Sequence, residues 1–467
     1  MKEMPALKRG VAWCALFFLS AKVWALPFTI APAPNTIFPA SINSGQPVTA
    51  FYTVTNNTKL TFSGVYLASL PPAVMPLNTN LSLPDAPCTP PFTLPAGGSC
   101  TMGFLITGAV NNPVNANNAI LCIPGAPKTC QGFPVTIPSS GWQLSASVSN
   151  GSFAGYVELL LSNTSTLFAA GHSDNEFSAL WRYANGIWST IFQGSALTTG
   201  SGSTFQALTF KDAVHGFIGG HNNAFGTVYS LDTSTNPALV VDLQFKNHTF
   251  TPGGQQEYPY EVDSLLYYVP NNLLYVGGEV NTDTINNYGA VYAFDGTTWT
   301  NLALENANFV DSLAISNGIL YAAIIGYGVN FAEVFSYPVA GGSWADTYLP
   351  NSIIEIHSLV VDSKGVLYAG GYDNHGGTVW KYQSGQWVSL GFTGGSDIKS
   401  LVIGPGDVLY ATGVNTNYGG GVWAYAKGVW TTLSPGSSSL INSIALLQGS
   451  LFAAGQTYVA EQSIWQR

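Results

Sequence analysis

Leu274-Tyr275-Val276-Gly277-Gly278 is followed by the aromatic residue Tyr292 and, seven positions later, by Trp299. The stretch has the pattern of an apolar strand that ends in small residues, then a strand with an aromatic residue, then a strand with Trp. Asp295-Gly296 stands between the last two, and Asp-Gly is a strong hairpin signal. The pattern therefore predicts consecutive antiparallel strands joined by tight turns.

The same pattern recurs seven times between Leu167 and the C-terminus, in steps of 42 to 58 residues. This period, with four short strand patterns in each copy, is typical of β-propeller blades. A charged-residue content of only 8% and 51 glycines also favour strands and turns over helices. We therefore expect an all-β chain with a seven-bladed β-propeller over residues 141–467, in which the central strands carry Leu167-Phe168, Gly216-Phe217, Leu274-Tyr275, Leu320-Tyr321, Leu367-Tyr368, Leu409-Tyr410 and Leu451-Phe452.

The two ends of this repeat region complement each other. The last copy stops at Trp465-Gln466-Arg467 without a fourth strand, whereas Gly141-Trp142-Gln143-Leu144, ahead of the first copy, has the pattern of an isolated fourth strand. Pairing of the two segments would close the ring and leave no exposed central edge. We expect Trp142 to belong to the last blade.

The paired glycines, the aromatic residue and the Trp seven positions later resemble the Kelch repeat, and Gly277-Gly278, Tyr292 and Trp299 match it best. The resemblance covers residues 141–467 and implies a Kelch-like fold, in which the glycines let neighbouring blades approach closely. It implies no activity, because propellers host many unrelated functions.

Residues 26–140 lack the repeat and contain short alternating runs, such as Val48–Val54 and Cys100–Ile106, that predict strands with one buried face. A small β-sandwich is the simplest arrangement for them. The segments Tyr52–Asn57 and Phe92–Cys100 resemble Ig-like N-terminal domains of secreted bacterial proteins. This resemblance implies a structural or adhesive module and not a catalyst.

The sandwich region contains four of the five cysteines: Cys88, Cys100, Cys122 and Cys130. An even number in an exported chain predicts two disulfides, and of the three connectivities we expect Cys88 with Cys100 and Cys122 with Cys130. A metal site is the rival interpretation, but no C-x-x-C spacing is present and the first histidine is His172.

The first 25 residues have the features of an export signal: basic Lys2, Lys8 and Arg9, an apolar run over residues 11–19, and Val23-Trp24-Ala25 as a cleavage site. An uncleaved membrane anchor is the alternative, but the apolar run is too short to span a bilayer. We expect a periplasmic, cell-surface or extracellular protein without a membrane span after cleavage. The net charge of −10 makes nucleic acid a poor partner, and the sequence leaves the oligomeric state open.

Polar residues that differ between copies are the candidates for ligand binding. A Ser recurs at the start of the innermost strand, as in Ser264, Ser312 and Ser358, and we expect it to bond to backbone. The residue before it changes from copy to copy and should lie at the mouth of the central channel, where varied polar groups could hold a polar ligand or simply form a solvated rim. These ring positions are Gln206, Asp263, Asp311, His357, Lys399 and Asn442.

Loops on the same face add His172, Asp174, Glu176, His221, Glu279, Asp283, Asp373, His375 and Tyr418. Asx turns are an equally good explanation for many of the aspartates. The histidines show no metal-ligand spacing, so neither a metal nor a cofactor is expected. The long interval 231–261 could carry recognition or be a surface decoration.

Composition excludes two propeller enzymes. A galactose-oxidase-like copper enzyme needs a cysteine cross-linked to a ligand tyrosine, and residues 141–467 contain no cysteine. A sialidase needs an arginine triad, and the chain after residue 25 has only Arg182 and Arg467.

The leading hypothesis is a secreted or surface-associated protein that binds a protein or a glycan through one propeller face. The alternative is a polysaccharide hydrolase or lyase with Asp263, Asp311 and His357 as acid and base. A purely structural spacer is the third hypothesis.

Overall fold

The computed structural model describes residues 26–33, 36, 48–70, 74–77, 87–106, 114–125, 130–137, 142–147, 155–195, 202–222, 225–245, 257–282, 287–304, 307–326, 331–416, 419–435, 438–457 and 462–467. These ranges consist of strands, turns and short 3-10 segments such as η3 (Val269–Asn271) and η4 (Pro405–Asp407), which confirms the all-β class. None of them contains a helix that is long and apolar enough to cross a membrane. The expected signal peptide, Asp283 and Tyr418 lie outside the described residues.

The N-terminal part is a sandwich of two four-stranded sheets. Tyr52, Phe104 and Phe133 meet between the sheets, with ring centroids 5.6 Å apart for Tyr52–Phe104 and 5.8 Å apart for Tyr52–Phe133. The alternation predicted for the second strand is present, because Ala50, Tyr52 and Val54 are all buried. One sheet is β1 (Phe28–Pro32), β2 (Val48–Asn56), β6 (Ser99–Ile106) and β4 (Val74–Pro76), and the other is β5 (Phe92–Leu94), β3 (Phe62–Ser69), β7 (Val114–Cys122) and β8 (Gln131–Ile137).

Both expected disulfides are present. Cys88 bonds to Cys100 with a Cα–Cα distance of 5.2 Å, and Cys122 bonds to Cys130 with a Cα–Cα distance of 4.1 Å. The first bridge joins the segment before β5 to β6 within the sandwich core, and the second joins the two sides of the β7–β8 connection. Each bridge closes a short loop, as the sequential pairing requires.

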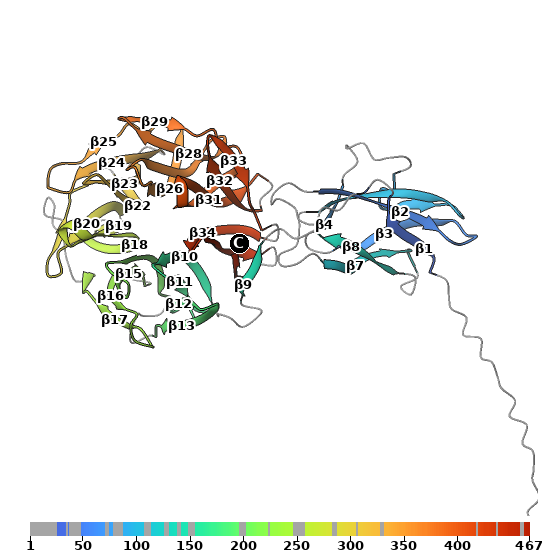
Figure 1. Ribbon diagram of the computed structural model, residues 1–467, viewed down its shortest axis with the longest axis horizontal. Helices are drawn as coiled ribbons and strands as arrows, with labels where there is room; N and C mark the ends of the chain where they lie inside the picture. Colours follow the sequence, from blue (N-terminus) through green and yellow to red (C-terminus); the bar gives the residue numbers. More distant parts are fainter. Residues whose placement is uncertain are drawn as a thin grey trace, which may run out of the picture.

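The remaining strands form seven four-stranded antiparallel sheets within the described residues, arranged around a centre (Figure 1). The first strand of each sheet contacts the first strand of the next, and β34 contacts β10. The sheets therefore form a closed ring, which is a β-propeller.

From the centre outward, the first four sheets are β10 (Tyr156–Asn163), β11 (Thr166–His172), β12 (Ser178–Ala184), β13 (Ile187–Gln193); β14 (Thr204–Phe210), β15 (His215–His221), β16 (Gly226–Asp232), β17 (Leu239–Asp242); β18 (Glu257–Tyr268), β19 (Leu273–Thr282), β20 (Asn287–Phe294), β21 (Trp299–Asn301); and β22 (Ala307–Ser316), β23 (Ile319–Gly326), β24 (Ala332–Pro338), β25 (Ala345–Asp346). The last three are β26 (Ile353–Val361), β27 (Leu367–Asp373), β28 (Gly376–Gln383), β29 (Gln386–Ser389); β30 (Gly395–Gly404), β31 (Val408–Asn415), β32 (Gly420–Ala426), β33 (Val429–Thr432); and β34 (Ser438–Leu447), β35 (Ser450–Thr457), β36 (Gln462–Gln466), β9 (Gln143–Ser147).

The last sheet takes its outer strand from the other end of the repeat region. β9 pairs antiparallel with β36, with Ala146 opposite Ile464, so the expected pairing of the two end segments is present. Trp142, directly before β9, is fully buried and packs in the same core as Trp465. A short segment ahead of the first copy thus completes the final sheet.

The recurring tryptophan at the outer strand joins neighbouring sheets. Trp430 Nε1 donates a hydrogen bond to the Leu390 carbonyl oxygen of the preceding sheet at 3.0 Å, and Trp142 Nε1 donates in the same way to the Leu433 carbonyl oxygen. Trp299 and Trp344 donate to the Leu243 and Leu302 carbonyl oxygens of the preceding sheets, and Trp188 and Trp387 donate to the Ser145 and Thr347 hydroxyl groups. This residue of the repeat is therefore structural.

Candidate functional site

Every innermost strand contains a β-bulge, and the bulged residue is the one that varies between sheets. In β22, Val310 pairs with Ile324 and Ser312 pairs with Ala323, so Asp311 has no partner across the ladder. A bulge re-aims the side chain of its extra residue. The residues at this equivalent bulge of the seven innermost strands are Glu158, Gln206, Asp263, Asp311, His357, Lys399 and Asn442, and five of these strands have a second bulge nearer their start.

The second glycine of the repeat makes room for this bulge. A Cβ at Gly371 would overlap the Glu355 carbonyl oxygen, and a Cβ at Gly171 would overlap the Tyr156 carbonyl oxygen. The first glycine has the predicted role, since a Cβ at Gly277 would lie 2.7 Å from Val310 Cγ1 of the next sheet. The two glycines therefore have different roles: the second leaves space for the bulge, and the first leaves space for the next sheet.

The Ser that follows the bulge binds backbone, as expected from its recurrence. Ser264 Oγ accepts a hydrogen bond from Leu313 N at 2.9 Å, and Ser312 Oγ accepts one from Leu359 N at 2.9 Å. Ser358 and Ser443 accept equivalent bonds from Leu401 and Leu160. Each bond runs from one innermost strand to the next. The serine is therefore structural, whereas the residue directly before it is variable.

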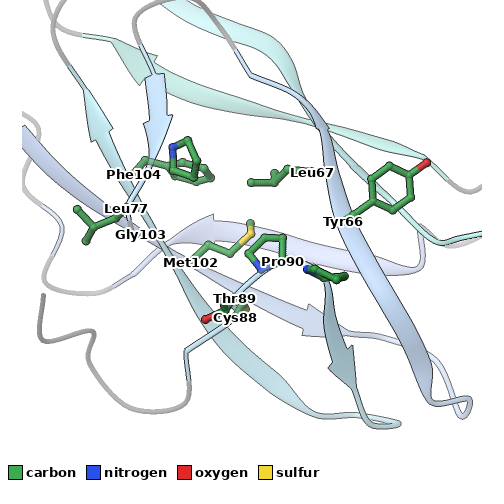
Figure 2. A pocket seen from close by; sticks show the side chains of 11 residues that line it. Tyr66, Leu67, Leu77, Cys88, Thr89, Pro90, Met102, Gly103 and Phe104 are labelled. Carbon is green, nitrogen blue, oxygen red and sulfur yellow. The ribbon is translucent and has the colours of Figure 1, made fainter. Parts of the chain in front are cut away.

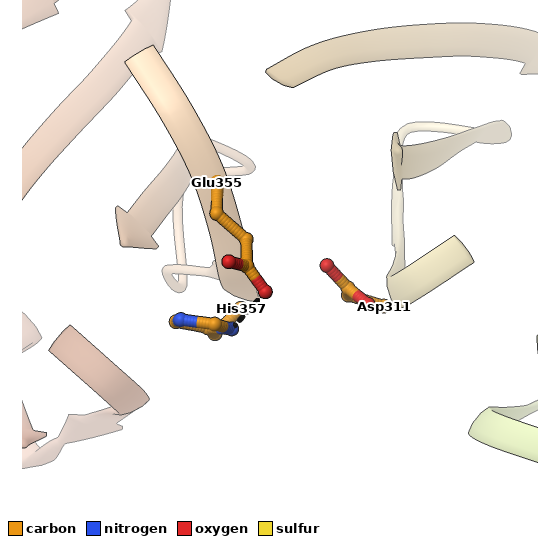
Figure 3. Close-up of side chains that lie close together, drawn as sticks. All are labelled: Asp311, Glu355 and His357. Carbon is orange, nitrogen blue, oxygen red and sulfur yellow. Dashed lines mark ion pairs between the residues drawn. The ribbon is translucent and has the colours of Figure 1, made fainter. Parts of the chain in front are cut away.

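Five side chains from three adjacent sheets form what we call the His357 cluster: Asp311, Glu355, His357, Asp397 and Lys399. Lys399 Nζ lies 2.7 Å from Asp397 Oδ2 and 2.9 Å from His357 Nε2. His357 Nδ1 lies 3.3 Å from Glu355 Oε1, and Asp311 faces both of these residues from the neighbouring strand (Figure 3). Three carboxyl groups therefore surround one ammonium group and one imidazole.

Burial and neighbouring charges set the ionisation of the His357 cluster. Burial raises the pKa of Asp311 to about 7, and its interactions with His357 and Lys399 only partly offset this effect. Burial also opposes ionisation of Asp397, but its interactions with His357 and Lys399 prevail and lower its pKa. Because an ammonium group has no lone pair, the Lys399 contact makes His357 Nε2 the acceptor and leaves the ring proton on Nδ1, toward Glu355.

A second group, the His221 cluster, consists of Glu158, His172, Gln206, His221 and Glu261. Gln206 Nε2 donates to Glu261 Oε1 at 2.5 Å, and Gln206 Oε1 lies 2.9 Å from His221 Nδ1. The hydrogen bond with His221 lowers the pKa of Glu261, whereas burial raises the pKa of Glu158 against the opposing charges of His172 and His221. This cluster contains no lysine or arginine.

Two further contacts extend the clusters around the ring. Asn442 Nδ2 donates to Tyr156 Oη at 2.8 Å, and the Tyr156 ring stacks on His172 with centroids 5.5 Å apart. Burial raises the pKa of Asp263 well above its ordinary value, and the charges of Glu261, Asp311 and the buried Glu279 act in the same direction. Asp263 is therefore coupled to carboxyl groups of both clusters.

A cavity of about 370 Å³ adjoins the His221 cluster, lined by Glu158, His172, Glu176, Gly202, Ser203, Thr204 and His221. Thr204 Oγ1 is buried and has no hydrogen-bond partner among the described residues.

The remaining loop candidates do not join either cluster. Asp373 Oδ1 accepts a hydrogen bond from His375 N at 2.7 Å in the β27–β28 turn, and the His375 side chain is 90% exposed. Asp174 is also exposed. These positions have the geometry of turn residues.

Four acidic residues of the clusters were absent from the sequence-based candidates: Glu158, Glu261, Glu355 and Asp397. Glu158 lacks the marker used to find the ring, because Leu159 stands where other copies have Ser. The other three lie two positions before a ring residue, on the same side of the strand. That spacing, as in Glu355-x-His357, is the signal that could have identified them.

A pocket of about 350 Å³ also lies in the sandwich (Figure 2). Leu67, Met102 and Phe104 line it together with Pro90 and the disulfide-bonded Cys88. Tyr66 is the only ionisable residue of this lining, so the pocket offers no acid–base pair.

No protein-family model matches the chain, and no curated protein matches it. Among solved structures, it is similar to a chain of the Mitotic Checkpoint Complex, at 15% identity and a TM-score of 0.47 over 67% of this chain and 87% of that chain. It is also similar to Trypanosoma rangeli sialidase in complex with the inhibitor DANA, at 12% identity and a TM-score of 0.43 over 64% of this chain and 55% of that chain. Likeness at this level carries no information on function.

Proposed function

We propose that the protein binds a glycan or a protein through the channel-mouth face of its propeller. The observation that supports this function is the set of seven bulged residues, which differ from sheet to sheet while the adjacent serines and the outer tryptophans recur. A repeat that served only as a scaffold would have no need of six types of polar residue at one position.

The many carboxyl groups at the channel mouth limit the classes of ligand that it can bind. Lys399 is the only lysine or arginine in the two clusters. Six carboxyl groups belong to the clusters or lie between them: Glu158, Glu261, Asp263, Asp311, Glu355 and Asp397. Carboxylates accept hydrogen bonds from hydroxyl and ammonium groups. The face therefore suits a neutral or amino sugar, or a basic protein segment, better than an anionic ligand.

The proposed setting is an exported two-domain protein. Residues 1–25 act as the signal peptide, residues 26–140 form an Ig-like spacer or anchor, and residues 141–467 form a seven-bladed Kelch-like propeller. Two disulfides are consistent with an oxidising compartment outside the cytoplasm.

Glycan and protein arrays probed with the purified exported protein test this function. We expect binding that is lost in Asp263→Asn and Glu261→Gln and kept in Asp232→Asn, whose acid lies at the opposite end of the same propeller, beside His215. Equal loss of binding in all three variants would contradict binding through the channel-mouth face. If the protein binds none of the probes, the spacer hypothesis is favoured.

One observation supports a polysaccharide hydrolase or lyase as the second candidate. Glu261 and Asp263 stand two residues apart, yet hydrogen bonding lowers the pKa of Glu261 while burial raises that of Asp263. Carboxyl groups with opposed pKa shifts are suited to act as base and acid. Release of reducing ends from a polysaccharide panel, abolished in Asp263→Asn, would favour this reaction.

A further inference from the structure

Three potential metal ligands converge at one place on the channel mouth. Asp311, Glu355 and His357 each present a donor atom, and these atoms all lie within 4.8 Å of one another. Ligand atoms around a divalent cation are separated by roughly 3–4.5 Å, given bond lengths of about 2.0–2.2 Å. Small side-chain shifts are enough to bring the three atoms onto one ion (Figure 3).

Asp311 provides a separate indication that a ligand belongs here. Its Oδ2 atom is closed to solvent and has no hydrogen-bond partner among the described residues. A buried carboxyl oxygen without a partner is costly, and coordination is one of the ways in which proteins satisfy such an atom.

The strands hold this geometry from two sides. Asp311 and His357 occupy the bulges of β22 and β26, which are neighbouring innermost strands, and Glu355 lies two residues before His357. Ligands carried by sheet strands are better fixed than ligands on loops. The site is therefore already assembled in the fold.

A carboxyl group lies near each ring nitrogen of His357. Its Nδ1 atom faces Glu355, and its Nε2 atom lies 3.3 Å from Asp397 Oδ1. A ligating histidine usually donates its other ring N–H to a carboxylate. Coordination through Nδ1 would move the ring proton to Nε2, toward Asp397, while Lys399 keeps its ion pair with Asp397 Oδ2.

We propose that Asp311, Glu355 and His357 bind a divalent transition-series cation, Zn²⁺ or Mn²⁺, with Asp397 as the outer partner of His357. Two carboxylates and one imidazole leave coordination positions for water or for a hydroxyl group of a ligand. The mixed nitrogen and oxygen set favours these ions over Ca²⁺, which prefers oxygen ligands. The site goes beyond the proposed function, because metal binding can be measured without any glycan or protein ligand.

Titration calorimetry of the untagged, chelator-treated protein with ZnCl₂, MnCl₂ and CaCl₂ tests the site, and Co²⁺ absorption bands give a spectroscopic signature of the ligand set. We expect one equivalent of Zn²⁺ or Mn²⁺ to bind, with affinity at least about tenfold weaker in Asp311→Asn and His357→Ala. His215→Ala and His375→Ala are matched histidine controls outside the site and should leave the affinity unchanged.

Lys399→Met keeps the test informative if the ligand variants fail to fold. Lys399 donates to His357 Nε2 and holds the ring proton on the ligating atom, so its removal should strengthen binding of Zn²⁺. No binding of Zn²⁺, Mn²⁺ or Co²⁺ by the folded protein would overturn the proposal. So would binding that persists in Asp311→Asn and His357→Ala, or that is lost in His215→Ala.

Discussion

The outer rim of the propeller repeats the same residue from sheet to sheet, whereas the channel mouth varies its residues. At the rim, tryptophan recurs in most sheets and donates a hydrogen bond to the preceding sheet. At the mouth, the bulged residue varies among six polar types, and Asp263 and Asp311 are buried carboxyl groups with raised pKa values. Stability is concentrated where the repeat is regular, and the mouth gives up some stability to hold unusual polar groups.

Trp142→Ala should have the largest effect, because it removes a fully buried side chain and a hydrogen bond where the ring closes. We expect a loss of about 3–5 kcal/mol of unfolding free energy. Every tryptophan after residue 25 lies at or beyond Trp142, so tryptophan fluorescence during urea unfolding reports on the propeller alone. An unchanged midpoint would mean that the closing strand contributes little.

Asp263→Asn should act in the opposite direction and stabilise the protein at neutral and alkaline pH. Burial raises the folded-state pKa of Asp263, so ionisation costs stability that grows as pH rises from the unfolded-state pKa toward the folded-state pKa. The variant and the wild type should therefore unfold alike near pH 3 and diverge as pH increases. Thermal unfolding followed over this pH range measures the difference in stability. A variant less stable than the wild type at pH 8 would contradict the claim that the buried carboxyl group at the mouth costs stability.

Ser264→Ala, at the next residue, should lower stability by about 1–2 kcal/mol, because Leu313 N loses its hydrogen-bond acceptor. Ser336→Ala is the control, since the Ser336 hydroxyl group bonds at the exposed surface. Urea unfolding of both variants gives the comparison. Equal stabilities would show that the recurring serine does not join the sheets energetically.

Glu158→Gln should give the smallest effect, a slight gain in stability at pH 8 that disappears at pH 4. Burial raises the pKa of Glu158, but His172 and His221 offset part of the cost of its charge. Differential scanning calorimetry at the two pH values detects the change. A loss of stability at pH 8 would place Glu158 among the structural residues.

Much of the fold could be predicted from residue patterns. The apolar runs, turn residues and Trp spacing located the strands, and the incomplete copy at Trp465 identified Trp142 as its missing partner. The spacing of the cysteines also led to the observed pairing. These features are local or periodic, so each can be recognised from residues that lie close together or recur at fixed intervals.

The site was only partly predictable. Five ring residues followed from their place before the recurring serine and Gln206 from the same place in its copy, but Glu158 also lacks that serine, and Glu261, Glu355 and Asp397 lie two positions before a ring residue. The bulges and the contacts across sheets, such as Gln206 with Glu261, depend on how innermost strands from different copies meet. Nothing in a single copy encodes those distances.

The sequence by itself determined the repeated strands, the closing segment and the disulfides, because strand pairing and loop closure depend on alternation, turn chemistry and chain length. Only the tertiary structure decided which polar residues act together. Closing the ring brings Asp311, His357 and Lys399 from three separate sheets into one partly buried cluster, where burial raises the pKa of Asp311. That environment exists only once the innermost strands surround a common centre.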